Sequence, residues 1–350
     1  MSNSALESRP ATAPERPVPS RDDRKARVDA ALNLLERYGL LVLFVLTILF
    51  FSWMRPETFA TAANFRTIVT AQSVVAVCAL ALTFPLMAGR FDISVGATLG
   101  VSAIATAAVM SKHGLPLLPA VVFGIAFGAF IGVVNGSLVA YFGVNAIIGT
   151  LGTSTVLSGL ITAYTQGVPI TTSLSTTLTD LGSDRVAGIP AIFLIMLALS
   201  VIVWYVLTQT PYGRQLAAVG VNQRAAVLTG MRVRRIILLS FVASGLLGGA
   251  AGVMQVASQG TADPTTGGLN FILPAIAAVF LGATTWHPGR FNIPGTVLSL
   301  FFLGTAVSGL ALIGAEPWVN DLFNGLAIVI AIALSSQFRR RRTGEMNIGT

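Results

Sequence analysis

The sequence predicts an all-α, polytopic membrane protein with about ten transmembrane helices and one further short helix in a basic cytoplasmic loop. Three observations predict this class: 54% of the 350 residues are hydrophobic, only 10% are charged, and apolar runs recur along the chain. A soluble domain carries roughly a quarter charged residues, so a chain this apolar needs lipid as its solvent. The 35 glycines fit this class, because small residues let membrane helices approach closely.

Ten apolar segments follow one another along the chain, and about 20 apolar residues suffice to cross a bilayer. Glycine, proline, asparagine or a charged residue separates each pair of segments, although the third and the eighth have blurred edges. The predicted spans are residues 38–54, 68–88, 93–111, 116–141, 144–165, 188–208, 236–257, 268–284, 293–313 and 318–336.

The two ends of the chain differ from the transmembrane domain, which we place at residues 38–336. Residues 1–37 begin with a stretch rich in Pro, Ser, Arg and Ala, which is typical of a disordered tail. Residues 337–350 form a basic C-terminal tail. About thirty polar residues precede the first apolar run, so we expect no cleavable signal peptide.

The distribution of positive charge orients the predicted spans. Of 22 Lys and Arg residues, seven precede residue 38, five lie in the loop 210–236 and four lie in the C-terminal "FRRRR". An even number of spans puts these three segments on one side of the membrane, together with Arg290. The positive-inside rule then predicts that both termini and the loop 210–236 face the cytoplasm, in a plasma or inner membrane. The same rule explains the net charge of +8 without a nucleic-acid partner.

Several kinds of chemistry are absent from the sequence. Lys25 precedes Ala and Lys112 precedes His, so no G-x-x-x-x-G-K-[ST] phosphate loop exists. No G-x-S-x-G elbow or H-E-x-x-H motif occurs either. The lone Cys78 excludes a disulfide framework, and His113 and His287 are far apart, so we expect no metal site. The sequence therefore predicts a protein that is not an enzyme and holds no cofactor of its own.

The loop 210–236 carries five arginines and no acidic residue. We expect Gly220 to break the chain and Asn222 to cap a helix over residues 223–229, about 10 Å long. Gly230 then supplies a left-handed C-terminal residue. A small apolar face comes from Ala225, Ala226 and Leu228.

A two-turn helix does not hold itself together in water and must lean on something. One alternative is the lipid surface, where the arginines would face anionic head groups. The other alternative is a cytoplasmic partner with a cleft for the small side chains. Because the chain has no nucleotide site, a partner that hydrolyses ATP is the obvious candidate.

Asp92, in "AGRFDISVGA", is the clearest charge near the membrane interior. An ionised group at depth costs about 2.5–3.5 kcal/mol, so it is usually functional or paired. A second interpretation is that Asp92 or Ser94 caps the helix that follows, and the two interpretations are compatible.

Four stretches of the sequence resemble one known family in their order along residues 38–336. "YGRQLAAVGVNQRAAVLTGMRVRR" (212–235) resembles the coupling loop of membrane permeases in ribose-type ATP-binding cassette (ABC) sugar importers. "FDISVGA", "NAIIGTLGT" and "LPAIAAVFLGATTWHPGRFNIPGT" resemble further motifs of that family. The coupling residues that the resemblance implies are Gly213, Arg214, Gly220, Asn222, Arg224, Ala225, Ala226 and Gly230.

The resemblance implies a transport function and three protein partners. Two permease copies would form the pathway, cytoplasmic ABC ATPase subunits would dock on the coupling helices, and an extracytoplasmic solute-binding protein would deliver a monosaccharide. A ribose-, xylose- or galactose-like sugar is expected, with a polyol or nucleoside as the alternative. An ion-coupled secondary carrier is a further alternative, but it would need several intramembrane acids.

The motifs and the polarity of the spans give candidates for the solute pathway, because polar side chains can hydrogen-bond hydroxyl groups. The alternative for each Ser or Thr is a bond back to its own helix. The candidates are Asp92, Ser94, Thr150, Thr153 and Ser154, with Asn135, Asn270, Asn320 and Asn324 as weaker ones. Arg90 and His287 depart from the family pattern and leave the solute open. Arg90 could pair with Asp92 or narrow the pathway.

Overall fold

Helices dominate the part of the chain that the structure, a computed structural model, describes: residues 21–286 and 288–343. His287, residues 1–20 of the predicted N-terminal tail and residues 344–350 lie outside it. The described helices are α1 (Arg21–Met54), α2 (Ala62–Met87), α3 (Val95–His113), α4 (Leu117–Ala140), α5 (Ala146–Thr165), α6 (Thr176–Ser183), α7 (Ala191–Gln209), α8 (Pro211–Val221), α9 (Gln223–Leu228), α10 (Val233–Gln259), α11 (Leu269–Gly282), α12 (Ile293–Leu312) and α13 (Pro317–Thr343).

The predicted class, an all-α polytopic membrane protein, is confirmed. Within the described residues, eight helices are long and apolar enough to cross a membrane. Two shorter apolar helices, Tyr38–Met54 within α1 and α11, occupy the first and eighth of the ten predicted positions. α11 begins at Leu269, and the preceding Gly268 packs against the backbone of α3: a Cβ added at Gly96 would lie 2.2 Å from the Gly268 carbonyl oxygen.

The outermost helices extend beyond the predicted spans. α1 begins at Arg21, so residues 21–37 are helical where we expected a disordered tail. This stretch holds no Gly or Pro and is rich in Arg, Ala and Leu, which are strong helix formers. α13 likewise continues to Thr343, into the predicted C-terminal tail.

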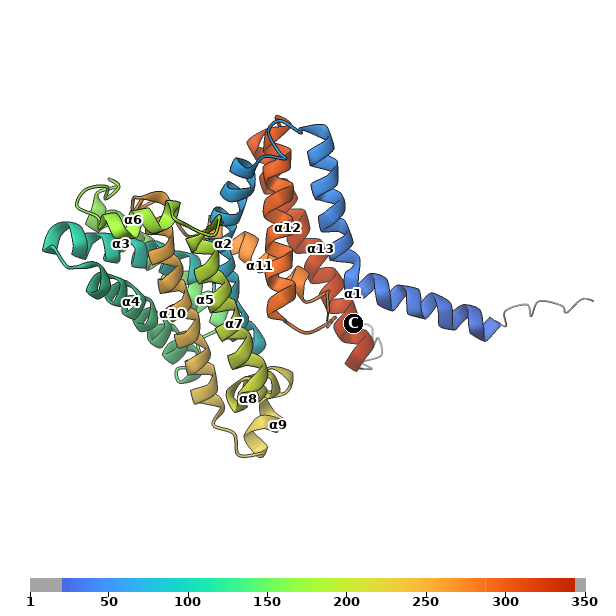
Figure 1. Ribbon diagram of the computed structural model, residues 1–350. Helices are drawn as coiled ribbons and strands as arrows, with labels where there is room; N and C mark the ends of the chain where they lie inside the picture. Colours follow the sequence, from blue (N-terminus) through green and yellow to red (C-terminus); the bar gives the residue numbers. More distant parts are fainter. Residues whose placement is uncertain (1–20, 287, 344–350) are drawn as a thin grey trace, which may run out of the picture.

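The centre of the molecule is α10, which packs against α2, α3 and α4. Paired glycines let α4 and α10 touch backbone to backbone: a Cβ on Gly128 would lie 2.4 Å from the Gly245 carbonyl oxygen. Such close approach is typical of helix pairs in membranes. Figure 1 shows α2 between two groups of helices, α3–α10 on one side and α1 with α11–α13 on the other.

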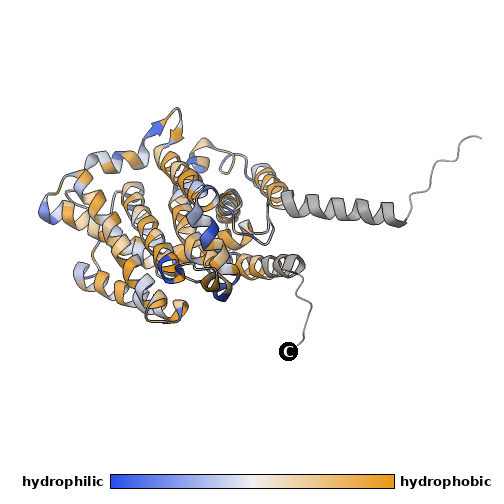
Figure 2. Ribbon diagram, turned by 90° about the horizontal axis from the view of Figure 1, so that it is seen from below, coloured by the Kyte–Doolittle hydropathy of each residue, from blue (hydrophilic) through white to orange (hydrophobic). Residues whose placement is uncertain are grey.

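Large apolar side chains lie on the outward faces of several spanning helices, as a lipid solvent requires. Hydrophobic residues lie along most helices (Figure 2). Phe130 of α4, Ile148 of α5 and Ile202 of α7 are all exposed large hydrophobic residues.

Contacts between connecting segments define two opposite faces of the molecule. On one face, Ile170 and Ala262 form an isolated antiparallel bridge, near α6 and the hairpin of β1 (Arg185–Val186) and β2 (Ile189–Pro190). On the other face, α8 and α9 lie beside the segment 88–94 that joins α2 to α3. Figure 1 shows α6 at the upper left and α9 at the bottom.

Candidate functional site

A buried polar network, formed by Asp92, Ser94, Asn135, Thr153 and Ser244, joins four parts of the chain. One oxygen of Asp92, Oδ1, accepts from the Ser94 amide at 3.1 Å and from the Ser94 hydroxyl at 2.5 Å. The other, Oδ2, accepts from the Ser244 hydroxyl of α10 at 2.8 Å. Only 2% of Asp92 is exposed. Three hydrogen bonds therefore replace the water that the carboxyl group loses.

The polar network continues across α4 to α5. Asn135 Nδ2 donates to the Ser94 hydroxyl at 2.7 Å, and the Thr153 hydroxyl donates to Asn135 Oδ1 at 2.7 Å. Since Ser94 and Asn135 are 1% exposed, each bond forms in a medium of low dielectric, where it is strong and costly to lose. The polar network fixes α4, α5 and α10 around the start of α3.

The structure brings most of the predicted pathway residues together. Thr150, also buried, accepts from the Ile93 amide at 3.0 Å and so holds the same segment from α5. Ser154 is half-buried on α5, next to Thr153 in the sequence but outside the polar network. Ser244 is a member that the sequence did not predict, because an uncharged serine in the Gly-rich α10 carries no signal for a partner 152 residues away.

Arg90 does not pair with Asp92 as we considered. Its Nη2 donates to Gln223 Oε1 of α9 at 2.8 Å, in an exposed position. The reason is that segment 88–94 runs from the face carrying α9 into the body. Its start therefore faces α9, whereas Asp92 is already buried beside α10.

Gly220 does not break the chain as predicted, because α8 runs through it to Val221. Its small size serves packing instead: a Cβ at Gly220 would lie 1.9 Å from the Met87 carbonyl oxygen at the end of α2. Gly213 is equally constrained, since its Cβ would lie 2.1 Å from the Leu207 carbonyl oxygen. α8 is thus seated tightly on the ends of α2 and α7.

The short helix α9 has the predicted cap at each end. Asn222 Oδ1 accepts from the Ala225 amide at 3.0 Å, which satisfies one free donor of the first turn. Gly230 has a φ of +81°, and the amides of Gly230 and Met231 donate to Val227 and Ala226. These two bonds form a Schellman motif, so a helix of six residues is closed at both ends.

The apolar face of α9 differs from the predicted one. Ala226 is 4% exposed and anchors the helix to its own chain, whereas Val227 and Leu228 are 56% and 88% exposed. Arg214 and Arg224 are exposed too. The helix therefore presents a small apolar tip beside exposed positive charge, and Ala226 belongs to its base.

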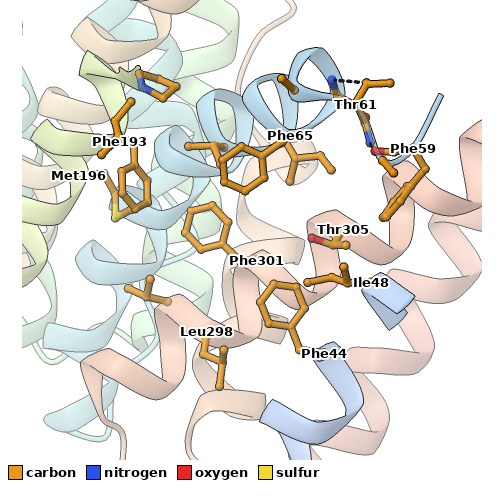
Figure 3. A pocket seen from close by; sticks show the side chains of 18 of the residues that line it. Phe44, Ile48, Phe59, Thr61, Phe65, Phe193, Met196, Leu298, Phe301 and Thr305 are labelled. Atoms are coloured by element: carbon orange, nitrogen blue, oxygen red, sulfur yellow. Dashed lines mark hydrogen bonds between the residues drawn. The ribbon is translucent and has the colours of Figure 1, made fainter. Parts of the chain in front are cut away.

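A cavity of about 810 Å³ lies elsewhere and is lined by α1, α2, α7 and α12. Its wall is mainly aromatic and aliphatic, with Phe65, Phe193 and Phe301 around it (Figure 3). A solute rich in hydroxyl groups needs hydrogen-bonding partners that this wall lacks. Neither this cavity nor a second one of about 270 Å³ is lined by the predicted pathway residues.

Comparison with known families covers both the polar network and the loop that carries α8 and α9. The family described as "Branched-chain amino acid transport system / permease component" matches residues 64–332, which include the polar network, α8 and α9. The chain belongs to this permease family. Membership gives the permease a transport role and not that of an enzyme.

The permease is similar over most of its length to several importer subunits. It is 34% identical to the ribose import permease protein RbsC of Bacillus subtilis, over 89% of this chain and 96% of the relative. It is 30% identical to the D-allose transport system permease protein AlsC of Escherichia coli, with coverage of 85% and 91%. It is 29% identical to the autoinducer 2 import system permease protein LsrD of Photorhabdus temperata, with coverage of 86% and 92%. These likenesses confirm the family that the sequence motifs predicted.

Proposed function

We propose that this permease is the membrane subunit of an ATP-driven importer for a monosaccharide-like solute, with two identical copies enclosing the passage. A cytoplasmic ABC ATPase docks on α9, and a solute-binding protein delivers the solute at the opposite face. Ribose and allose, named in two of the similar relatives, represent the expected solute class. The charge distribution supports an orientation with both termini and α9 in the cytoplasm.

The observation that carries this proposal is the exposed, doubly capped α9. Burying a side chain such as Leu228 contributes about 1.5–3 kcal/mol, and the caps hold the tip ready before the partner arrives. The exposed Arg214 and Arg224 suit an acidic rim on the ATPase, because rim charges guide association.

Replacing Leu228 by Glu tests the docking role directly. The variant puts a charge on a tip that must be buried, so the ATPase subunit should co-purify at least tenfold less, as measured by pull-down from solubilised membranes. Val168→Glu is the matched control, since Val168 is 63% exposed on the opposite face. Equal recovery of the ATPase with both variants would refute docking at α9.

The outward face of α5 is our candidate for the wall of the passage. Thr155, Ser158 and Thr162 are exposed, and each hydroxyl donates to the carbonyl four residues earlier at 3.0–3.1 Å. Their oxygen lone pairs remain free to accept hydrogen bonds from a sugar. Thr153 and Ser154, half-buried on the same helix, would extend this wall toward the polar network.

A cysteine scan tests whether this face of α5 meets water. In Ser158→Cys, a hydrophilic thiol reagent should react much faster than in Val201→Cys, whose position on α7 is 56% exposed and which we place against lipid. The native Cys78 is buried and gives little background. If Ser158→Cys reacts as slowly as Val201→Cys, α5 faces lipid and the passage lies elsewhere.

Segment 88–94 links the docking helix to the polar network in the proposed mechanism. Arg90 contacts Gln223 of α9, and Asp92, two residues later, contacts α3 and α10. A displacement of α9 by the ATPase would thus act on the segment that holds four helices together, and could change their arrangement around the passage.

A further inference from the structure

The cavity of about 810 Å³ is an elongated groove between α7 on one side and α1 and α12 on the other, with the start of α2 as its floor. Its lining on α12 runs from Pro294 to Thr305. At 1.5 Å per residue this is about 16 Å, close to half of the roughly 30 Å hydrocarbon thickness of a bilayer. The groove therefore has the length of one leaflet.

The chemistry of the groove changes along its length. Phe193 and Phe301 meet edge to face in its wall, with ring centroids 5.8 Å apart. Polar lining residues gather at the end near loop 55–61, and two of them are already satisfied by the protein. Thr61 accepts from the Asn64 amide, and Asn64 Oδ1 accepts from Ser308. The groove offers an apolar interior and a polar mouth.

Two arginines, neither of them a lining residue, lie in the segments next to the mouth and suit an anionic head group there. Arg55 lies in the loop that leads to the lining residue Phe59, and its carbonyl oxygen accepts from the Phe59 amide at 2.8 Å. Arg66 follows the lining residue Phe65. One carboxylate, Glu57, lies in the same loop, so the two arginines leave a net positive charge there.

We propose that this groove binds one phospholipid, with an acyl chain along Leu298 and Phe301 and its phosphate near Arg55 and Arg66. The lipid would fill the space between α7 and the pair α1 and α12, and so join the two groups of helices. This inference rests on the membrane-spanning fold and is independent of the transported solute.

Photocrosslinking tests the lipid site. The full-length permease is reconstituted in nanodiscs with a phosphatidylglycerol that carries a diazirine in its acyl chain, and adducts are mapped by mass spectrometry. Adducts should be several-fold more frequent at Phe193, Leu298 and Phe301 than at Val201 and Ile202 of α7, which are more exposed. Adducts spread evenly over these positions would overturn the proposal.

Three variants distinguish a bound lipid from other occupants of the groove. Leu298→Trp fills the groove and should abolish adducts at Phe193 while those at Val201 persist; unchanged adducts at Phe193 would contradict the site. In Ile48→Cys and Leu197→Cys, two copies of the same variant should remain uncrosslinked by an oxidant. Efficient disulfide-linked dimers would assign the groove to a second copy of the chain and overturn the lipid proposal.

Discussion

The polar network around Asp92 and the loop that carries α9 are both polar interruptions of an apolar chain, yet they differ in how their polar groups are satisfied. In the polar network, each member bonds to another member inside the molecule. In the loop, Arg214 and Arg224 are exposed, and so is the apolar Leu228. A region whose polar groups hydrogen-bond to one another holds the fold together. A region with exposed charges and exposed apolar side chains is available to a partner.

Of the substitutions that test this difference, Asp92→Leu is expected to have the largest effect on stability. The substitution leaves the buried donors of Ser94 and Ser244 without their acceptor, and each unsatisfied donor costs about 1–3 kcal/mol. We expect a clear fall in the thermal unfolding temperature of the purified permease, measured in detergent.

Asp92→Asn is the matched variant, because its amide oxygen can still accept from Ser94 and the Ser244 hydroxyl can rotate to accept from its amino group. It should fold with little loss of unfolding temperature and yet transport less. An Asp92→Leu permease as stable as the wild type would mean that the network does not hold the fold.

Gly220→Val comes next, because it acts at the junction between the two regions. The added Cβ would overlap the Met87 carbonyl oxygen, and such overpacking costs typically about 1–3 kcal/mol. α8 should move off the end of α2, lowering both the unfolding temperature and ATPase recovery in pull-downs. Gly325→Val on α13, where an added Cβ meets no atom within 4 Å, is the control and should leave both unchanged. If both variants had the same unfolding temperature and the same ATPase recovery, the close packing of α8 against the end of α2 would be contradicted.

Sequence patterns predicted the local features of both regions and missed the distant ones. Apolar runs located the spans, and Asn222 and Gly230 marked the ends of α9, because hydropathy and capping depend on neighbouring residues. Arg90 bonds to Gln223 across 133 residues, and no periodicity connects two such positions.

Glycine and alanine in the loop were hard to interpret for the same reason. Gly220 looked like a helix breaker, although it sits within α8 because Met87 approaches from another helix. Ala225 and Ala226 looked equivalent, but only Ala226 is buried against the rest of the chain. Which face of a short helix is inward depends on tertiary packing, which a single sequence does not encode locally.

The smallest effect is expected from Arg90→Gly, which removes one exposed hydrogen bond between the two regions. Such a bond contributes about 0.5–1.5 kcal/mol, and 1.4 kcal/mol corresponds to about tenfold. ATPase recovery should stay normal, while solute transported per ATP hydrolysed falls about two- to tenfold in proteoliposomes.

Two companion variants distinguish this link from a general loss of structure. Gln223→Leu should lower the same ratio, because it removes the acceptor, whereas Gln223→Glu keeps an acceptor for Arg90 and should retain coupling. If all three variants transport as much solute per ATP as the wild type, the two regions are not coupled through Arg90.

The most direct test of the central claim, that this permease works on energy delivered through α9, is solute accumulation in proteoliposomes. Labelled ribose and allose would be offered to vesicles holding the permease alone, or the permease with its cognate ATPase, binding protein and ATP. We predict accumulation against a gradient only in the complete system, and its loss with Leu228→Glu. Accumulation by the permease alone, driven by a proton or sodium gradient, would contradict the account.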